Sequence, residues 1–141
     1  MDKELFFSVK TLITRSNTFL AVYNLVDGCK IWDLPGGRME FGETAEETLK
    51  REIIEELNVE IIPLKVIDTW NYMHSDTCQI TGIIYHSELM TDEIKLSHEH
   101  DGYEWIDFEK AYTIFTKDFL LEKIQRWNWD AITNNNIKFT K

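Results

Sequence analysis

Cysteine, proline and glycine are scarce in this sequence, and their scarcity excludes several classes of protein. The chain of 141 residues has two cysteines, two prolines and six glycines. Two thiols are too few for a disulfide framework, and Cys29 and Cys78 lack the spacing of metal ligands. We expect both to be buried or idle thiols in a reducing cytosol. So little glycine and proline argues against a disordered chain.

Basic side chains and long apolar runs are also lacking. The chain has 15 lysines and arginines against 25 acidic residues, a net charge of -10. Affinity for nucleic acid comes largely from Lys and Arg, so we expect no nucleic-acid polymer as partner. No run reaches the roughly 18 apolar residues of a membrane span, and the first residues do not resemble a secretory signal. We therefore expect a soluble, cytoplasmic protein without a membrane partner.

The residues that are present are sufficient for one packed domain spanning residues 1–141. Hydrophobic residues make up 43% of the chain and aromatic residues 13%. Residue patterns predict strands at 5–14, 18–26, 29–34, 61–72, 79–89 and 103–106, helices at 44–57 and 108–129, a loop at 35–37, turns at 15–17, 27–28 and 74–76, and a loose tail at 133–141. This order predicts a mixed α/β or α+β fold.

The two predicted helices carry distinct buried faces. In the first, Thr44 and Glu47 form a capping box, and Asn58 suits the left-handed residue that ends a helix. Its apolar stripe consists of Ala45, Leu49, Ile53 and Leu57. The expected buried face of the second consists of Ala111, Phe115, Phe119 and Ile124, and Trp127 and Trp129 are expected to pack against the sheet.

Three glutamates on the first helix form its most unusual feature. Glu52, Glu55 and Glu56 stand at helical spacing, so neighbouring Cβ atoms lie about 5–6 Å apart. They overlap the edge of the apolar stripe, where like charges repel more strongly than in water. A hard divalent cation such as Mg²⁺ or Mn²⁺ would relieve that repulsion. A solvated acidic face is the alternative interpretation of the helix taken alone.

The segment around this helix resembles the Nudix box. That motif is Gly, five residues, Glu, seven residues, then Arg-Glu-apolar-any-Glu-Glu-any-Gly-apolar, and it spans residues 37–59 here. The matching residues are Gly37, Glu43, Arg51, Glu52, Ile53, Glu55, Glu56 and Val59. Asn58 replaces the last glycine, and asparagine also tolerates a left-handed conformation.

The resemblance implies the Nudix fold, a mixed sheet sandwiched between helices. It also implies hydrolysis of a nucleoside diphosphate linked to another group. Glu52, Glu55 and Glu56, with the carbonyl of Gly37 or its neighbour, would hold one to three Mg²⁺ ions, and Mn²⁺ is a possible substitute. Arg51 would pair with Glu43 and orient the cluster.

The general base lies either on this helix or on a loop. Residues His98, Glu99 and His100 follow the fifth predicted strand. The resemblance suggests that a Glu or His from this region reaches the metal site, and we assign that role to Glu99. We expect His98 and His100 to be solvated loop residues.

Candidate substrate contacts surround the box. Trp32 and Tyr72 could stack on a base, as could Phe41 and Trp105, although each could instead serve in packing. Many relatives place a basic residue at the end of the second strand, where this chain has Tyr23 and Asn24. Arg38 is the expected substitute, with Arg15 and Lys30 as further candidates.

Three functions are compatible with these features. The first is a hydrolase of small nucleotides, with a nucleoside triphosphate or nucleotide sugar favoured over a dinucleoside polyphosphate or ADP-ribose. The residues at 74–77 lack the proline and tyrosine marks of the latter subfamilies. The second is a non-catalytic nucleotide sensor, and the third an acidic interaction module. A homodimer is compatible with each.

Overall fold

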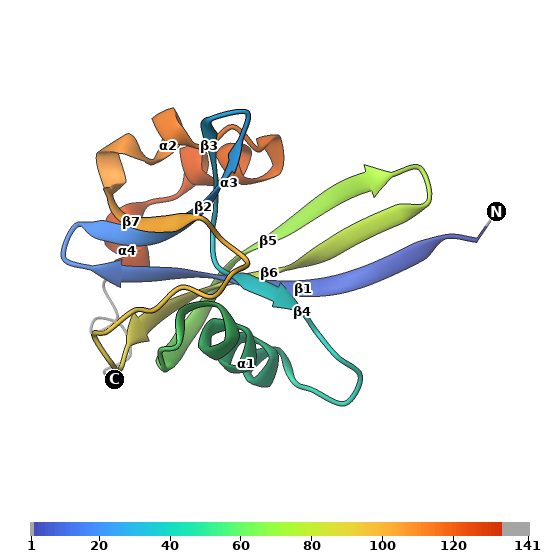
Figure 1. Ribbon diagram of the computed structural model, residues 1–141, viewed down its shortest axis with the longest axis horizontal. Coiled ribbons are helices and arrows are strands. Elements are labelled where there is room, and N and C mark those ends of the chain that lie inside the picture. The colour runs from blue at the N-terminus through green and yellow to red at the C-terminus, as the bar shows by residue number, and fades with distance from the viewer. Residues whose placement is uncertain (1, 134–141) are drawn as a thin grey trace.

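One mixed sheet with helices on both faces forms the structure, a computed structural model that describes residues 2–133 (Figure 1). The strands are β1 (Glu4–Arg15), β2 (Thr18–Val26), β3 (Cys29–Asp33), β4 (Gly36–Arg38), β5 (Ile61–Ser75), β6 (Cys78–Leu89) and β7 (Gly102–Asp107). The helices are α1 (Ala45–Leu57), a 3-10 turn η1 (Phe108–Lys110), α2 (Ala111–Ile114), α3 (Asp118–Arg126) and α4 (Trp129–Thr133). The predicted tail beyond residue 133 lies outside the described residues.

The sheet combines parallel and antiparallel pairs. Its strands follow the order β3-β2-β1-β6-β5, while β4 pairs with β1 and β7 pairs with β2. The long β1–β6 pair is parallel, and the other pairs are antiparallel. Within residues 2–133, none of the helices has the length and apolar character needed to cross a membrane.

The core lies in two layers, one on each face of the sheet. On one face, Leu49, Ile53 and Leu57 of α1 are fully buried against the sheet. On the other face, α2, α3 and α4 contribute a second cluster of buried side chains. Figure 1 shows α1 below the sheet and α2 and α3 above it. The predicted mixed sheet between helices is thereby confirmed, and so is the apolar stripe of α1.

Local signals in the sequence correctly predicted the hairpin between β2 and β3 and both ends of α1. Asp27 and Gly28 adopt positive φ angles of 53° and 80°, as a tight hairpin turn requires. Thr44 and Glu47 form the reciprocal capping box, and Asn58 ends the helix with φ 57°. The hairpin between β5 and β6 turns at residues 76–77 rather than 74–76, because β5 continues to Ser75.

The prediction of a loop at 35–37 is wrong, because Gly36–Arg38 forms strand β4, which pairs with β1. The register places Lys10 opposite Gly36 and Ser8 opposite Arg38. A Cβ on Gly36 would lie 2.0 Å from the carbonyl oxygen of Val9, and its φ is +147°. Only glycine can approach β1 so closely. This pairing brings the start of the box against the centre of the sheet.

The prediction of a single helix at 108–129 is also wrong, because the helical conformation is interrupted at Phe115 and at Trp127. Both residues are extended, with ψ of 129° and 138°. Phe115 is buried against Phe19, with ring centroids 6.0 Å apart, and the indole of Trp127 donates to Asp68 at 2.8 Å. Tertiary contacts therefore override the helical pattern. Of the expected buried face, Ala111, Phe115 and Ile124 are buried, while Phe119 is half-buried.

Candidate active site

Glu56 lies at the centre of the box and is almost completely buried. It is 3% exposed, and its Oε1 accepts a hydrogen bond from the backbone N–H of Gly36 at 3.3 Å. The Nε2 atom of His100 lies 3.5 Å from the same oxygen. Burial raises the pKa of Glu56, although its contacts with His100 and Gly36 oppose that rise. A carboxylate in such a place is stabilised by a nearby cation.

Glu52 packs directly against the glycine that begins the motif. A Cβ on Gly37 would lie 2.1 Å from Oε1 of Glu52, so a larger residue here would displace the Glu52 side chain from this position. Burial raises the pKa of Glu52, while a hydrogen bond from Arg51 opposes the rise. The spacing of the box thus places the half-buried carboxylate of Glu52 against the backbone of β4.

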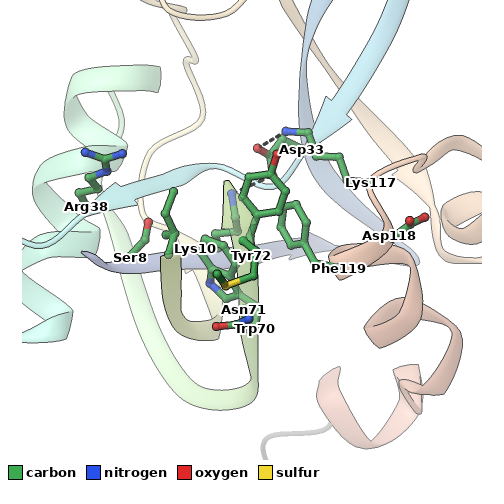
Figure 2. Close-up of a pocket in the computed structure, with 12 residues that line it drawn as sticks. Ser8, Lys10, Asp33, Arg38, Trp70, Asn71, Tyr72, Lys117, Asp118 and Phe119 are labelled. Atoms are coloured by element: carbon green, nitrogen blue, oxygen red, sulfur yellow. Dashed lines mark hydrogen bonds and ion pairs between the residues drawn. The ribbon is translucent and has the colours of Figure 1, made fainter. Parts of the chain in front are cut away.

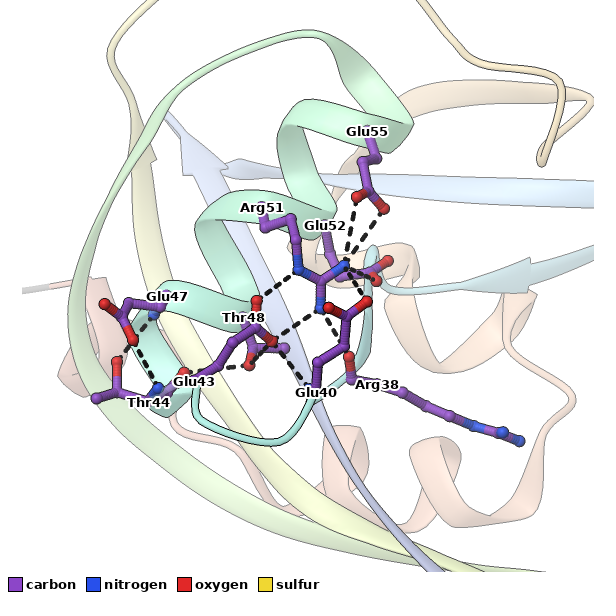
Figure 3. Close-up of polar contacts among 9 residues, drawn as sticks. All are labelled: Arg38, Glu40, Glu43, Thr44, Glu47, Thr48, Arg51, Glu52 and Glu55. Carbon is purple, nitrogen blue, oxygen red and sulfur yellow. Dashed lines mark hydrogen bonds and ion pairs between the residues drawn. The ribbon is translucent and has the colours of Figure 1, made fainter.

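Arg51 organises the acidic side chains around it (Figure 3). Its Nε and Nη2 atoms donate to Glu43 at 2.6 and 2.9 Å, which confirms the expected pair. Its Nη1 atom donates to Glu52 at 2.8 Å and reaches Glu55 at 3.4 Å. Its Nη2 atom also donates to the carbonyl of Arg38 at 2.9 Å, which ties α1 to the end of β4.

Glu43 is the most strongly stabilised carboxylate of the group. It accepts hydrogen bonds from Arg51, from the backbone N–H of Glu40 at 2.9 Å and from the hydroxyl of Thr48 at 2.8 Å. The Arg51 guanidinium is the main reason why the pKa of Glu43 falls from 4.5 to about 2. The contact therefore stabilises the folded chain only while Glu43 is ionised.

Replacing Glu43 with Gln is expected to remove a pH-dependent part of the stability. Above its unfolded pKa of 4.5, Glu43 contributes fully, and the contribution is lost as the pH falls toward about 2. Urea unfolding should show wild type more stable than Glu43→Gln at about pH 6, with a smaller difference at about pH 3. Glu40→Gln, whose carboxylate is exposed and 3.8 Å from Arg51, is the matched control. A gap that does not shrink on acidification would contradict the assignment.

The expected convergence of Glu52, Glu55 and Glu56 is not seen in this geometry. Within residues 2–133, no three acidic, histidine or cysteine side chains are close enough together to hold a metal ion. Glu52 and Glu55 turn toward Arg51, whose guanidinium neutralises them, whereas Glu56 turns toward His100. Carboxylate oxygens are nevertheless the donors that a hard divalent cation prefers, and the buried Glu56 has two long contacts, from the Gly36 N–H at 3.3 Å and from His100 at 3.5 Å. The residues therefore fit such an ion after side-chain rotation.

The loop at 98–100 contributes to the site through a residue that we did not expect. His98 and Glu99 are exposed, and the charge of Glu99 raises the pKa of Glu56. His100 was expected to be solvated, but its side chain is only 15% exposed beside Glu56. The loop is held there because Ser97 donates from its backbone to the carbonyl of Glu56 at 2.9 Å. No pattern in the sequence indicates this nonlocal contact.

A cavity of about 710 Å³ opens on the opposite face of the sheet from α1 (Figure 2). Arg38 and Tyr72, two of the expected substrate contacts, line it. Phe119 of α3 also lines it and packs against Tyr72, with ring centroids 5.0 Å apart. Trp32, the third expected contact, does not line this cavity; it is 7% exposed within the core, in edge contact with Tyr23.

Lys10, Asp33 and Lys117 form a polar cluster in this cavity that sequence analysis missed. Lys10 and Lys117 donate to the two oxygens of Asp33 at 2.8 and 2.7 Å. Burial opposes ionisation, but the two ammonium groups outweigh it and lower the pKa of Asp33. A lysine inside the apolar segment Val9–Ile13 was the available signal, since such a charge requires a partner.

The other expected contacts lie away from this cavity. Arg15 stacks on Trp105, with its guanidinium 4.2 Å from the ring centre. Lys30 donates to Glu104 at 3.0 Å. Phe41 is fully exposed on the loop before α1. Of the three candidate basic substitutes, only Arg38 lines the cavity.

Comparison with known proteins agrees with this geometry. The family model described as NUDIX domain matches residues 8–129. Bis(5'-nucleosyl)-tetraphosphatase [asymmetrical] of Mus musculus is 34% identical over 92 residues, which cover 60% of this chain and 61% of that protein. Nucleoside triphosphatase NudI of Klebsiella pneumoniae is 30% identical over 88 residues, which cover 55% and 62%. The match thus spans about three fifths of the length of these curated relatives.

A solved structure extends the similarity across most of the chain. The crystal structure of a MutT protein from Methanosarcina mazei Go1 aligns with a TM-score of 0.77 and 26% identity, and covers 89% of this chain and 94% of that one. The box residues, the sheet between helices and the family model all lead to one assignment: this chain belongs to the Nudix family.

Proposed function

We propose that this chain is a Mg²⁺-dependent hydrolase that cleaves the diphosphate linkage of a small nucleoside diphosphate derivative. The observation that carries the proposal is the buried Glu56 carboxylate, held between the Gly36 N–H and His100. Such a site favours a divalent cation, and the family generally uses one. Mn²⁺ is a possible substitute. Relatives with both tetraphosphatase and triphosphatase names support the reaction class.

The box residues have separate roles in this proposal. Glu56 and Glu52 would be the principal ligands, with Glu55 and the carbonyl of Gly37 completing the set. A bound divalent ion would neutralise the phosphate oxygens and acidify the attacking water. Arg51 positions Glu52 and Glu55, and its bond to Glu43 holds the guanidinium in place.

A carboxylate near Glu56 is proposed to accept the proton of the attacking water. Glu99 is one candidate, because it is exposed on the loop that borders Glu56 and its negative charge raises the pKa of Glu56. Glu52 and Glu55 on α1 are the alternatives. Since Arg51 already binds both of these, Glu99 is the one that can reach a water without breaking that contact.

The cavity is proposed to hold the nucleoside, with the phosphates directed toward the box. Figure 2 shows Arg38 at one end of the cavity, with its guanidinium 3.9 Å from the centre of the Phe6 ring; from there it is proposed to contact phosphate oxygens. Tyr72 and Phe119 offer aromatic surface for a base or ribose. A volume of about 710 Å³ suits one nucleoside. This favours a nucleoside triphosphate or nucleotide sugar over a dinucleoside polyphosphate.

The experiment is to incubate the purified chain with a panel of nucleoside triphosphates, nucleotide sugars and dinucleoside polyphosphates. Products are identified by chromatography, with Mg²⁺, with Mn²⁺ and with a chelator. We expect cleavage of the diphosphate linkage that the chelator abolishes and added Mg²⁺ restores. Saturable nucleotide binding without turnover would instead indicate a sensor. The absence of both binding and turnover would indicate an acidic interaction module.

A further inference from the structure

At one end of the cavity, Lys10 and Lys117 are hydrogen-bond donors that share a single acceptor, the carboxylate of Asp33. The carboxylate of Asp33 accepts from Lys10, from Lys117 and from the backbone N–H of Leu34 at 2.8 Å. Each ammonium group has three N–H donors, so both lysines retain donors for a ligand. Asp33, in contrast, has little capacity left to accept a hydrogen bond from one.

The neighbouring side chain of Asn71 adds further donors to the same cavity, and Trp70 adds aromatic surface. The side-chain carbonyl of Asn71 accepts a hydrogen bond from Gln79 at 2.6 Å, which leaves the amide N–H groups of Asn71 available. Trp70 also lines the cavity and supplies aromatic surface, while its Nε1–H is buried away from solvent. Lys10 lies 5.0 Å from the centre of the Trp70 ring, so donors and aromatic surface adjoin.

The position of these donors separates them from the expected phosphate site. Figure 2 shows Arg38 and Lys117 at opposite ends of the cavity, and it is the backbone carbonyl of Arg38 that accepts a hydrogen bond from Arg51 of the box at 2.9 Å. Asp33 balances one of the two lysine charges, so the pair has a net charge of about one rather than two. A weakly positive group of donors beside aromatic rings suits an uncharged carbonyl better than a phosphate dianion.

We propose that this cavity selects nucleobases with a carbonyl oxygen over bases with an amino group at the same ring position. The proposal rests on the proposed function, in which the cavity holds the nucleoside. A carbonyl oxygen has two lone pairs and can accept from both lysines. An exocyclic amino group would instead face N–H donors and leave buried donors unsatisfied, which is costly. The expected substrates are therefore hypoxanthine, guanine, uracil or thymine nucleotides.

The test compares bases that differ at one exocyclic group and at the ring nitrogen beside it, which carries a hydrogen in the carbonyl bases and a lone pair in the amino bases. ITP against ATP and UTP against CTP each exchange a carbonyl for an amino group without a change in ring size. We expect kcat/KM to favour ITP and UTP by roughly tenfold or more, as expected from one unsatisfied buried donor. The two pairs must change in the same direction, because the same donors contact both ring types.

A matched pair of variants locates the preference in the cavity. Lys117→Gln keeps a donor for Asp33 and adds a carbonyl acceptor, so we expect the ITP/ATP ratio to fall to roughly threefold or less. Lys123→Gln removes a comparable contact between α3 and the sheet, at 3.5 Å from Asp68, but Lys123 does not line this cavity. This control should keep the wild-type ratio.

Binding measurements keep the inference testable without turnover. Calorimetry with IMP and AMP, in buffer without metal, should show that IMP binds with a lower Kd than AMP. This preference has the same direction as the one expected for kcat/KM with ITP and ATP. Equal affinity, tighter AMP binding, or an unchanged ratio in Lys117→Gln would overturn the inference. Hydrolysis of ATP and ITP at equal rates would overturn it as well and would leave the proposed function standing. Selective binding of IMP without hydrolysis of any nucleotide would support the inference on base selectivity and would contradict the proposed hydrolase function.

Discussion

The variant Glu56→Gln is expected to reduce kcat at least about a hundredfold, the scale of effect associated with disturbed metal sites. Glu56 is 3% exposed and lies between the Gly36 N–H and His100, so its charge is held at a fixed, buried position. Glutamine has nearly the same shape but no charge, and it therefore tests the charge alone. Steady-state kinetics with saturating Mg²⁺ measure the effect.

Two further measurements separate lost chemistry from lost folding in this variant. Burial raises the pKa of Glu56, so its ionised form is unfavourable in the metal-free protein. We therefore expect Glu56→Gln to be at least as stable as wild type in a chelator, and to gain less stability from added Mg²⁺. Glu46→Gln, an exposed site in the first turn of α1, should behave as wild type. Turnover near the wild-type rate in Glu56→Gln would reject its role as a metal ligand.

The variant Gly82→Ala is expected to show the largest loss of stability, about 3 kcal/mol or more. A Cβ at Gly82 would lie 1.7 Å from the carbonyl oxygen of Ser8, a backbone atom that cannot rotate away. Ser8 and Gly82 are partners in the central parallel pair of β1 and β6. Relief of the clash therefore requires the two strands to separate, which would also disturb the cavity wall that Ser8 forms.

Urea unfolding measures this loss, with Gly28→Asn as control. Gly28 has φ +80° with no atom within 4 Å of the added Cβ, and asparagine tolerates a left-handed conformation. We expect the control to lose less than about 1 kcal/mol. A loss of similar size in both variants would mean that backbone freedom, and not the contact with Ser8, explains the requirement for glycine at position 82.

The net charge of the chain is consistent with a cation-dependent site. A protein of charge -10 repels a diphosphate, and Arg51 is occupied by its own acidic neighbours. In the cavity, Arg38 counters this repulsion locally. Under the proposed function, substrate affinity is therefore expected to depend on a divalent ion and on Arg38.

The sequence alone determined the features that depend on short-range patterns. The capping box at Thr44, the left-handed Asn58 and the hairpin at residues 27–28 follow from local backbone preferences. The apolar stripe of α1 follows from the helical period, and the pair of Arg51 with Glu43 from the motif spacing. Each involves residues eight or fewer positions apart, or a single periodicity.

Only the tertiary structure decided the arrangements that join distant segments. Gly36–Arg38 became a strand because β1 offered a free edge, and the C-terminal segment broke because Phe115 and Trp127 found partners in the core and on β5. The contact of His100 with Glu56 and the binding of Lys117 to Asp33 join residues 44 and 84 positions apart. Such contacts depend on how the sheet and helices pack, and packing energies outweigh the local preferences that a sequence pattern records.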